Sequence, residues 1–149
     1  NAGEINAAVM GGHGDDMVPL VNHSTVAGVT LTELLSQSDI EDIVHKTKHG
    51  GAQIVELLGT GSAYYAPAYS TALMIESILE DKKEIYPCSV QLEGEYGYGD
   101  IVAGVPVVLG ANGVEKVIEL SLDETQTKAF AKSVASVQEL VTTLENKFF

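Results

Sequence analysis

An α+β fold, with an antiparallel or mixed sheet packed against long helices, is predicted by two features of the sequence. Strand-like runs gather at the start of the chain and again over residues 86–120, while helical periodicity fills residues 38–58, 67–83 and 123–144. Asn112-Gly113 lies between two apolar runs, and this dipeptide favours a tight hairpin between antiparallel neighbours. Strands and helices therefore segregate along the chain more than they alternate, which is typical of α+β proteins.

The first half of the chain predicts two short strands followed by two helices. Ile5–Met10 is apolar enough for a buried strand, and Val18–Val21 continues the pairing beyond a glycine-rich loop. We expect Ser38-Asp39-Ile40-Glu41 to form a capping box at the start of a long helix. Gly50-Gly51 should kink or break that helix. Pro67 lies near the first turn of the next helix, whose apolar face runs through Leu73, Met74, Ser77 and Ile78.

The second half predicts a small sheet and a final helix. Tyr86–Leu92 alternates as a strand does, and Glu93–Gly99 is a glycine-rich turn. Ile101–Leu109 and Val114–Leu120 are strand-like runs on either side of the expected hairpin turn. The last helix begins at Asp123-Glu124, and its apolar face comprises Phe130, Val134, Val137, Leu140, Val141 and Leu144. A chain of 149 residues can bury a sizeable core, so we expect one domain over residues 1–149.

Charge and cysteine content exclude several classes of partner. The formal net charge of −13 argues against nucleic acid and against an anionic membrane surface. No apolar run approaches the roughly 20 residues that a membrane-spanning helix needs. The single Cys88 cannot form an internal disulfide, which favours the reducing cytoplasm, and we expect it to be a small buried residue. All eight basic residues are lysines, so the chain has no arginine.

A histidine with glycines on both sides is the main candidate for a catalytic residue. Gly11-Gly12-His13-Gly14-Asp15-Asp16 follows directly on the first apolar run. Glycine permits a sharp turn and the close approach of another molecule, and histidine suits proton transfer near neutral pH. The alternative is a histidine on a tight turn whose ring is solvated or bonded to a backbone carbonyl.

Two further functions from other classes remain open. Glu41, His45 and His49 are four residues apart and can share one helix face, which permits metal binding, although a solvated polar face is favoured. A metal-dependent hydrolase would use His13, Asp15 and Asp16, with His45 and His49. The second alternative is a non-catalytic oligomerisation or binding module.

An ordered set of motifs carries a resemblance to a known family. The motifs are Gly11–Asp16, Ser24–Val29, Gly59–Ala68, Leu92–Gly97, Gly104–Val107 and Leu109–Glu115. In this order and spacing, the chain from about Asn6 to its end resembles the C-terminal half of the lactate/malate dehydrogenase family. The likeness is greatest to those malate dehydrogenases that are built like lactate dehydrogenase.

The resemblance implies that the chain is the C-terminal catalytic domain of an NAD-dependent oxidoreductase of the tricarboxylic acid cycle. In the family a Rossmann domain comes first and binds most of the cofactor through Gly-x-Gly-x-x-Gly, a motif that this chain lacks. We therefore expect the N-terminal Rossmann half of the same polypeptide to be a partner. The isolated fragment should be inactive, and the whole protein should form a homo-dimer or homo-tetramer.

The resemblance also implies roles for four residues. His13 would accept the hydroxyl proton of malate and return it to the carbonyl of oxaloacetate. Ser62 and Ala63 would lie beside the substrate and Pro67 near the nicotinamide, and no residue would bind a metal. A dicarboxylate is usually gripped by arginine, so the carboxylate clamps are expected from the N-terminal half.

Overall fold

The computed structural model describes residues 1–148 and confirms the α+β class: four α-helices surround three small antiparallel sheets. The first sheet has the order β1-β4-β5 and the second is a hairpin of β2 and β3. Their strands are β1 (Ile5–Asn6), β2 (Val9–Gly11), β3 (Met17–Pro19), β4 (Thr25–Val26) and β5 (Val29–Thr30). The third sheet is a meander of β6 (Glu84–Glu93), β7 (Gly99–Gly110) and β8 (Gly113–Val117).

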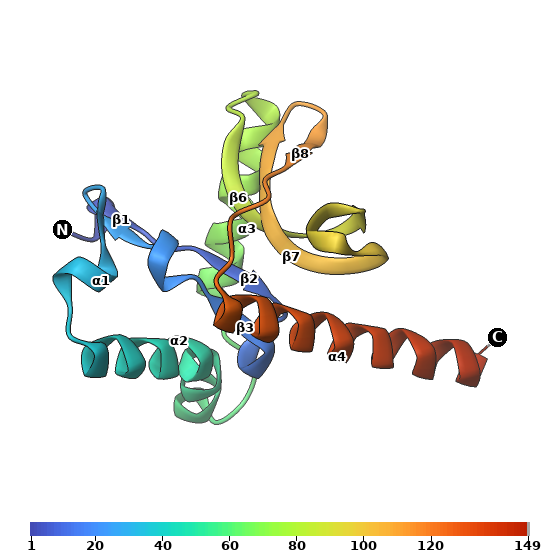
Figure 1. The fold of residues 1–149 in the computed structure, drawn as a ribbon, viewed down its shortest axis with the longest axis horizontal. Helices are drawn as coiled ribbons and strands as arrows, with labels where there is room; N and C mark the ends of the chain where they lie inside the picture. The colour runs from blue at the N-terminus through green and yellow to red at the C-terminus, as the bar shows by residue number, and fades with distance from the viewer. Residues whose placement is uncertain (149) are drawn as a thin grey trace.

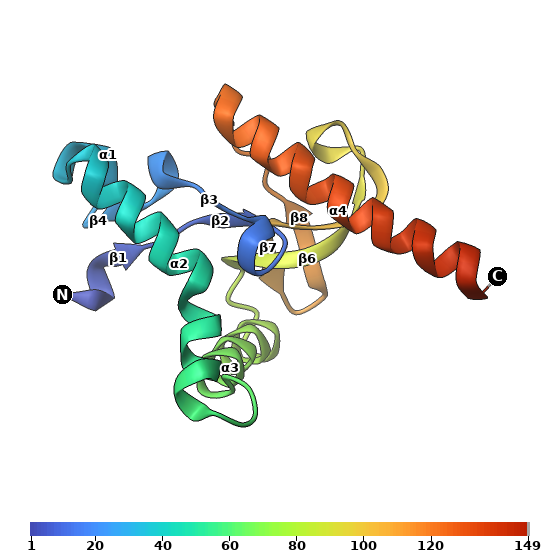
Figure 2. The same ribbon diagram turned by 90° about the horizontal axis from the view of Figure 1, so that it is seen from below.

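The three longer helices lie around the β2–β3 hairpin and the third sheet, and the short α1 lies beside the first sheet (Figures 1 and 2). Their bounds are α1 (Leu31–Leu34), α2 (Gln37–Leu58), α3 (Tyr65–Leu79) and α4 (Glu124–Phe148). Helix α4 contacts β2, β3 and β7. The main strand contact of α3 is with β7. The C-terminal half of α4 extends away from the rest of the molecule (Figure 1). None of the helices in this described range is both long and apolar enough to cross a bilayer.

The hydrophobic core lies where β6 and β7, the β2–β3 hairpin and α4 meet. Its most buried apolar side chains are Met10, Leu20, Leu92, Val105, Val107 and Phe130. Cys88 is also buried in this cluster, as the sequence predicts. The core therefore joins the hairpin that carries His13 to the largest sheet and to the last helix.

The second half of the chain follows its predicted elements closely. β6 and β7 pair over their whole length, with a bulge at Leu92/Glu93. The predicted hairpin is confirmed: Gly110 pairs with Gly113, whose φ of +82° is a conformation that glycine adopts without strain. β8 ends at Val117, three residues before the predicted end of the strand.

The prediction of one strand over Ile5–Met10 is wrong. The segment forms two strands with different partners, since Ile5–Asn6 pairs with β4 and Val9–Gly11 pairs with β3. Between them, the N–H of Ala8 donates to Ser24 Oγ at 3.0 Å. A side chain therefore replaces a ladder partner at this point, and the chain changes from one sheet to the other.

One helix prediction also needs correction. α2 begins at Gln37 because Ser36 is its N-cap, and Ser36 Oγ accepts the N–H of Asp39 at 3.3 Å. The capping box expected at Ser38 is therefore wrong. Of the kink or break expected at Gly50-Gly51, the break is absent because α2 continues to Leu58, and the helix instead bends in its C-terminal half (Figure 2). In α4, Leu140 and Leu144 are exposed because this half of the helix extends beyond the sheet.

Candidate active site

The candidate histidine lies on the loop that joins β2 to β3. Gly11 and Gly14 have φ values of +77° and +67°, which turn the chain on both sides of His13. His13 itself has an extended backbone and precedes a short 3₁₀ turn, η2 (Gly14–Asp16). Its side chain is exposed, so the imidazole is accessible to a ligand.

The base of this loop packs directly on β7. A Cβ atom placed on Gly104 would lie 2.2 Å from the carbonyl oxygen of Gly11, which is far inside van der Waals contact. Only glycine at position 104 lets the two backbones approach this closely. The third sheet therefore supports the end of β2, where the histidine loop begins.

His13 lines a pocket of about 230 Å³ between the hairpin and the third sheet. The remaining lining is mostly apolar or backbone and consists of Val9, Met10, Gly11, Gly12, Met17, Pro87, Cys88, Ser89 and Gly104. Burial raises the pKa of the Cys88 thiol, so this side chain stays protonated at neutral pH and is a poor nucleophile. His13 is thus the side chain of this lining whose type suits proton transfer.

Helix α2 lies against the other side of the histidine loop. A Cβ atom on Gly51 would lie 4.0 Å from His13 Nε2, so the bend of α2 passes next to the imidazole. Lys48 Nζ donates to the carbonyl oxygen of Asp15 at 3.4 Å, and His49 Nε2 lies 3.7 Å from Asp15 Oδ1. The Asp15 side chain is 91% exposed, so these contacts are screened by solvent and contribute little stability.

The residues considered for a metal site do not assemble into one. His45 and His49 stack with their ring centroids 4.3 Å apart, and His49 Nδ1 lies 2.7 Å from the carbonyl oxygen of His45. Across residues 1–148, no three His, Cys, Asp or Glu side chains come close enough to hold a metal ion. The arrangement gives no support to the metal-dependent hydrolase.

Ser62, Ala63 and Pro67 are not in the lining of the His13 pocket. Ser62 and Ala63 belong to the loop between α2 and α3, where Ser62 is exposed and Ala63 is half-buried. Pro67 is the third residue of α3, which confirms its predicted place in the first turn of a helix, and it is exposed. Ala63 lines a second pocket of about 230 Å³ together with Ile54, Leu58, Tyr64, Tyr65 and Ala66.

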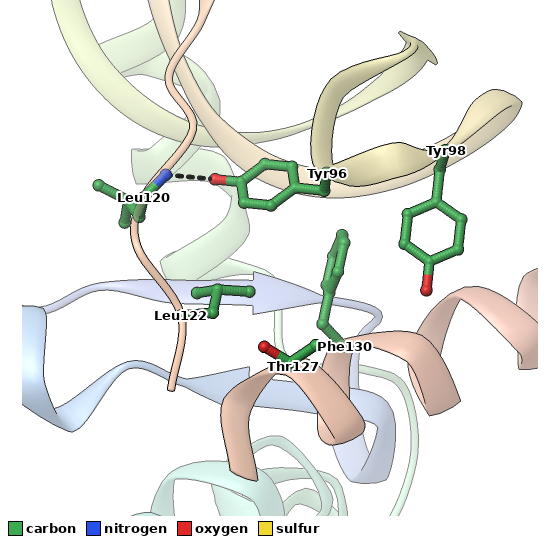
Figure 3. A pocket seen from close by; sticks show the side chains of 6 residues that line it. All are labelled: Tyr96, Tyr98, Leu120, Leu122, Thr127 and Phe130. Carbon is green, nitrogen blue, oxygen red and sulfur yellow. Dashed lines mark hydrogen bonds between the residues drawn. The ribbon is translucent and has the colours of Figure 1, made fainter. Parts of the chain in front are cut away.

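A third pocket, of about 200 Å³, lies between the turn that joins β6 to β7, the segment that follows β8, and α4 (Figure 3). The Tyr96 hydroxyl donates to the carbonyl oxygen of Ile118 at 2.8 Å and accepts the N–H of Leu120 at 2.9 Å. Burial raises the pKa of Tyr96, with a smaller contribution from the Glu119 carboxylate. The lining carries no carboxylate, amine, imidazole or thiol, and of its two phenols that of Tyr96 is hydrogen-bonded to the backbone. This pocket is therefore a packing feature.

Comparison with known proteins identifies the family. Residues 1–148 match the lactate/malate dehydrogenase α/β C-terminal domain. The chain belongs to the lactate/malate dehydrogenase family.

Relatives within this family support the assignment over nearly the whole chain. A malate dehydrogenase from Sulfurimonas denitrificans is 64% identical over 148 residues, which are 99% of this chain and 46% of the relative. A malate dehydrogenase from Aliarcobacter butzleri is 59% identical and covers 97% of this chain, again over 46% of the relative. The chain therefore spans about half the length of these curated relatives.

Solved structures of the family share the fold. The malate dehydrogenase from Aeropyrum pernix superposes with a TM-score of 0.91 at 45% identity, covering 96% of this chain and 48% of that one. The lactate dehydrogenase from Eimeria maxima, solved with NADH and oxamate, gives a TM-score of 0.93 at 39% identity. That match covers 97% of this chain and 45% of the Eimeria chain. Membership in this dehydrogenase family does not favour the hydrolase alternative.

Proposed function

We propose that residues 1–149 are the C-terminal catalytic domain of an NAD-dependent malate dehydrogenase, and that His13 transfers the substrate proton. The observation that carries this proposal is the exposed imidazole of His13 at the edge of an otherwise unreactive pocket. The close relatives named malate dehydrogenase support malate and oxaloacetate as the substrate pair.

The chemistry assigned to His13 needs one ring nitrogen that can gain and lose a proton. In malate oxidation the imidazole takes the hydroxyl proton, and in the reverse direction the imidazolium returns it to the carbonyl oxygen of oxaloacetate. When bound, NAD supplies the acceptor for the hydride from the carbon that bears this hydroxyl. A positioned acid–base group of this kind typically accelerates a reaction by about 10²–10⁴-fold.

The rest of this domain supplies only part of a binding site. The Ser62 hydroxyl and the Ala63 backbone are proposed to lie beside the substrate, on the loop that leads into α3. Pro67, exposed on the first turn of α3, is proposed to contact the nicotinamide. The chain has no arginine and no Gly-x-Gly-x-x-Gly, so the carboxylate clamps and most cofactor contacts are assigned to an N-terminal Rossmann half.

We further propose that the catalytic domain packs against that half and against other copies in a homo-dimer or homo-tetramer. Large apolar side chains at the end of α2 and along α3 support this, because Leu57, Tyr65 and Leu79 are each at least 80% exposed. Apolar surface of this kind marks sites that another protein surface covers. The free thiol of Cys88 supports the reducing cytoplasm as the compartment.

The test is the His13→Ala variant of the full-length protein, assayed by oxidation of NADH with oxaloacetate and, separately, with pyruvate. We expect the wild type to prefer oxaloacetate, and the variant to lose about 10²–10⁴-fold in kcat. His45→Ala is the matched control because His45 is exposed on α2 and should keep wild-type activity. If His13→Ala retains kcat within a few-fold of the wild type, the role assigned to His13 is wrong.

A further inference from the structure

The backbone next to His13 is tied to a helix that lies far away in the sequence. The N–H of Gly12 donates to Ser133 Oγ at 2.7 Å, across a separation of 121 residues, and also to the carbonyl oxygen of Asp16 at 3.2 Å. Ser133 is only 2% exposed, so little water competes for its hydroxyl. Because Gly12 directly precedes His13, this contact sets the direction in which the loop leaves β2.

The approach of α4 to the loop is as close as the backbone allows. A Cβ atom on Gly11 would lie 2.6 Å from Ser133 Oγ and 3.1 Å from Ser133 Cβ. The carbonyl oxygen of the same residue would lie 2.2 Å from a Cβ atom on Gly104 of β7. The first residues of the loop therefore pack closely against both α4 and β7, with no space for a side chain on Gly11 or on Gly104.

Ser133 can act as an anchor because its own helix is fixed in the core. Its neighbours on α4, Phe130 and Val134, are both buried. The Phe130 ring packs against Tyr96 and Tyr98, at centroid separations of 5.3 Å and 5.9 Å (Figure 3). The hydroxyl that receives the Gly12 N–H therefore occupies a well-defined place.

We propose that Ser133 is a positioning residue for proton transfer at His13. This inference rests on the proposed function of His13 and adds a residue that acts through the backbone, since Ser133 is not in the lining of the His13 pocket. Loss of the hydroxyl leaves Gly12 with only its longer bond to Asp16 and permits the loop to shift. A displacement of about 1 Å from the reactive geometry can cost about 10²-fold in rate.

The experiment compares Ser133→Ala, Ser133→Thr and Ser136→Ala in the full-length protein. We expect Ser133→Ala to lower kcat for oxaloacetate reduction by about tenfold or more, with KM within about threefold of the wild type. Ser133→Thr retains a hydroxyl on the same carbon and should restore most of kcat. Ser136→Ala removes a hydroxyl from the same helix, one that bonds only to the carbonyl of Lys132, and should leave kcat unchanged.

A second measurement reads the contact without catalysis. Hydrogen exchange at the Gly12 amide should be about threefold to tenfold faster in Ser133→Ala than in the wild type, as expected for the loss of one hydrogen bond. The melting temperature of each variant reports whether the fold is intact. Equal exchange rates in the two proteins would overturn the proposal, whatever their activity.

The two proposals fail in different ways. An active wild type, an inactive His13→Ala variant and a fully active Ser133→Ala variant would overturn the role of Ser133 and leave that of His13 intact. Full activity in His13→Ala would instead overturn the proposed function, and the exchange rate of Gly12 would then decide whether Ser133 orders the loop. A loss of kcat in Ser133→Ala that follows only the fraction of unfolded protein also counts against positioning.

Discussion

Gly104 affects the candidate site because glycine has no side chain. Its sequence context, Gly104-Val105-Pro106-Val107, is that of an ordinary apolar strand, and β7 indeed passes through the core. The structural reason for glycine is visible only in three dimensions, because a Cβ atom would meet the carbonyl oxygen of Gly11 at 2.2 Å. The residue therefore matters for the space that it leaves to the histidine loop.

Cys88 provides a prediction about reactivity. Its thiol is buried, and burial raises its pKa, so the nucleophilic thiolate forms only above the pH range of an exposed cysteine, whose pKa is about 8.5. We expect an aromatic disulfide reagent to label the native protein at pH 7.5 at least about tenfold more slowly than the urea-unfolded protein. The labelling rate of the native protein should rise only at alkaline pH.

The raised pKa of Cys88 also makes the free energy of unfolding depend on pH. Because the pKa is higher in the folded state, the contribution of the protonated thiol is present at neutral pH and is lost as the pH rises above the value of the unfolded thiol. For the labelling experiment, the single cysteine of the chain provides a control, because the unfolded protein should take up one label per chain. Rapid labelling of native protein at neutral pH would show that Cys88 is accessible and is not shielded as the structure describes.

At the level of elements, the start of α2 distinguishes two neighbouring serines. Ser36 caps the helix, whereas Ser38 lies within its first turn. Ser36→Ala should lower the free energy of unfolding by about 1 kcal/mol, because an N–H at the helix start loses its partner. Ser38→Ala is the matched control and should change stability by less than about 0.5 kcal/mol. Chemical denaturation of both variants measures the difference, and a larger loss in Ser38→Ala would contradict the observed cap.

Elements set by local patterns could be predicted from the sequence. The hairpin at Asn112-Gly113 and the start of α4 both depend on neighbouring residues, and both are confirmed. At the start of α4, Asp123 and Gln126 exchange hydrogen bonds between their side chains and backbone N–H groups. Such contacts span only three residues, so the pattern of side chains determines them.

Elements set by distant partners could not be predicted. Ile5–Met10 has the composition of one strand, but Ser24 takes the N–H of Ala8 and divides the segment. Leu140 has the periodicity of a core residue, yet α4 extends past the sheet that would cover it. For the candidate site, the histidine loop was evident from its glycines, whereas Ser133 offered no sequence signal because its partner lies 121 residues away.

On the scale of the whole molecule, large apolar side chains are exposed over two of the helices. The exposed side chains cluster on the second half of α2 and on α3 and include Ile54, Leu57, Leu58, Tyr64, Tyr65, Tyr69, Ile75 and Leu79. The loop with Ser62 and Ala63 lies between these two helices. The proposed substrate residues are therefore part of the surface that we assign to contact with the N-terminal half.

Residues 1–149 produced alone should consequently neither bind NAD tightly nor reduce oxaloacetate. The chain has no arginine for a dicarboxylate and no phosphate-binding glycine motif, and Pro67 is its one proposed contact with the cofactor. Titration calorimetry with NAD should give no saturable heat at micromolar concentrations, whereas the full-length protein serves as the positive control. A micromolar dissociation constant for the isolated domain would reveal a cofactor site within this half.

The bond between Gly12 and Ser133 also has a consequence for biosynthesis. The two residues are made far apart in time, because the ribosome must add 121 further residues after Gly12 before Ser133 exists. Contacts of such long sequence separation form late, after the entropy of closing the intervening loop has been overcome. The histidine loop of a nascent chain therefore lacks its anchor until α4 has been made and has docked, so the contact that orders this loop forms only after that helix has emerged.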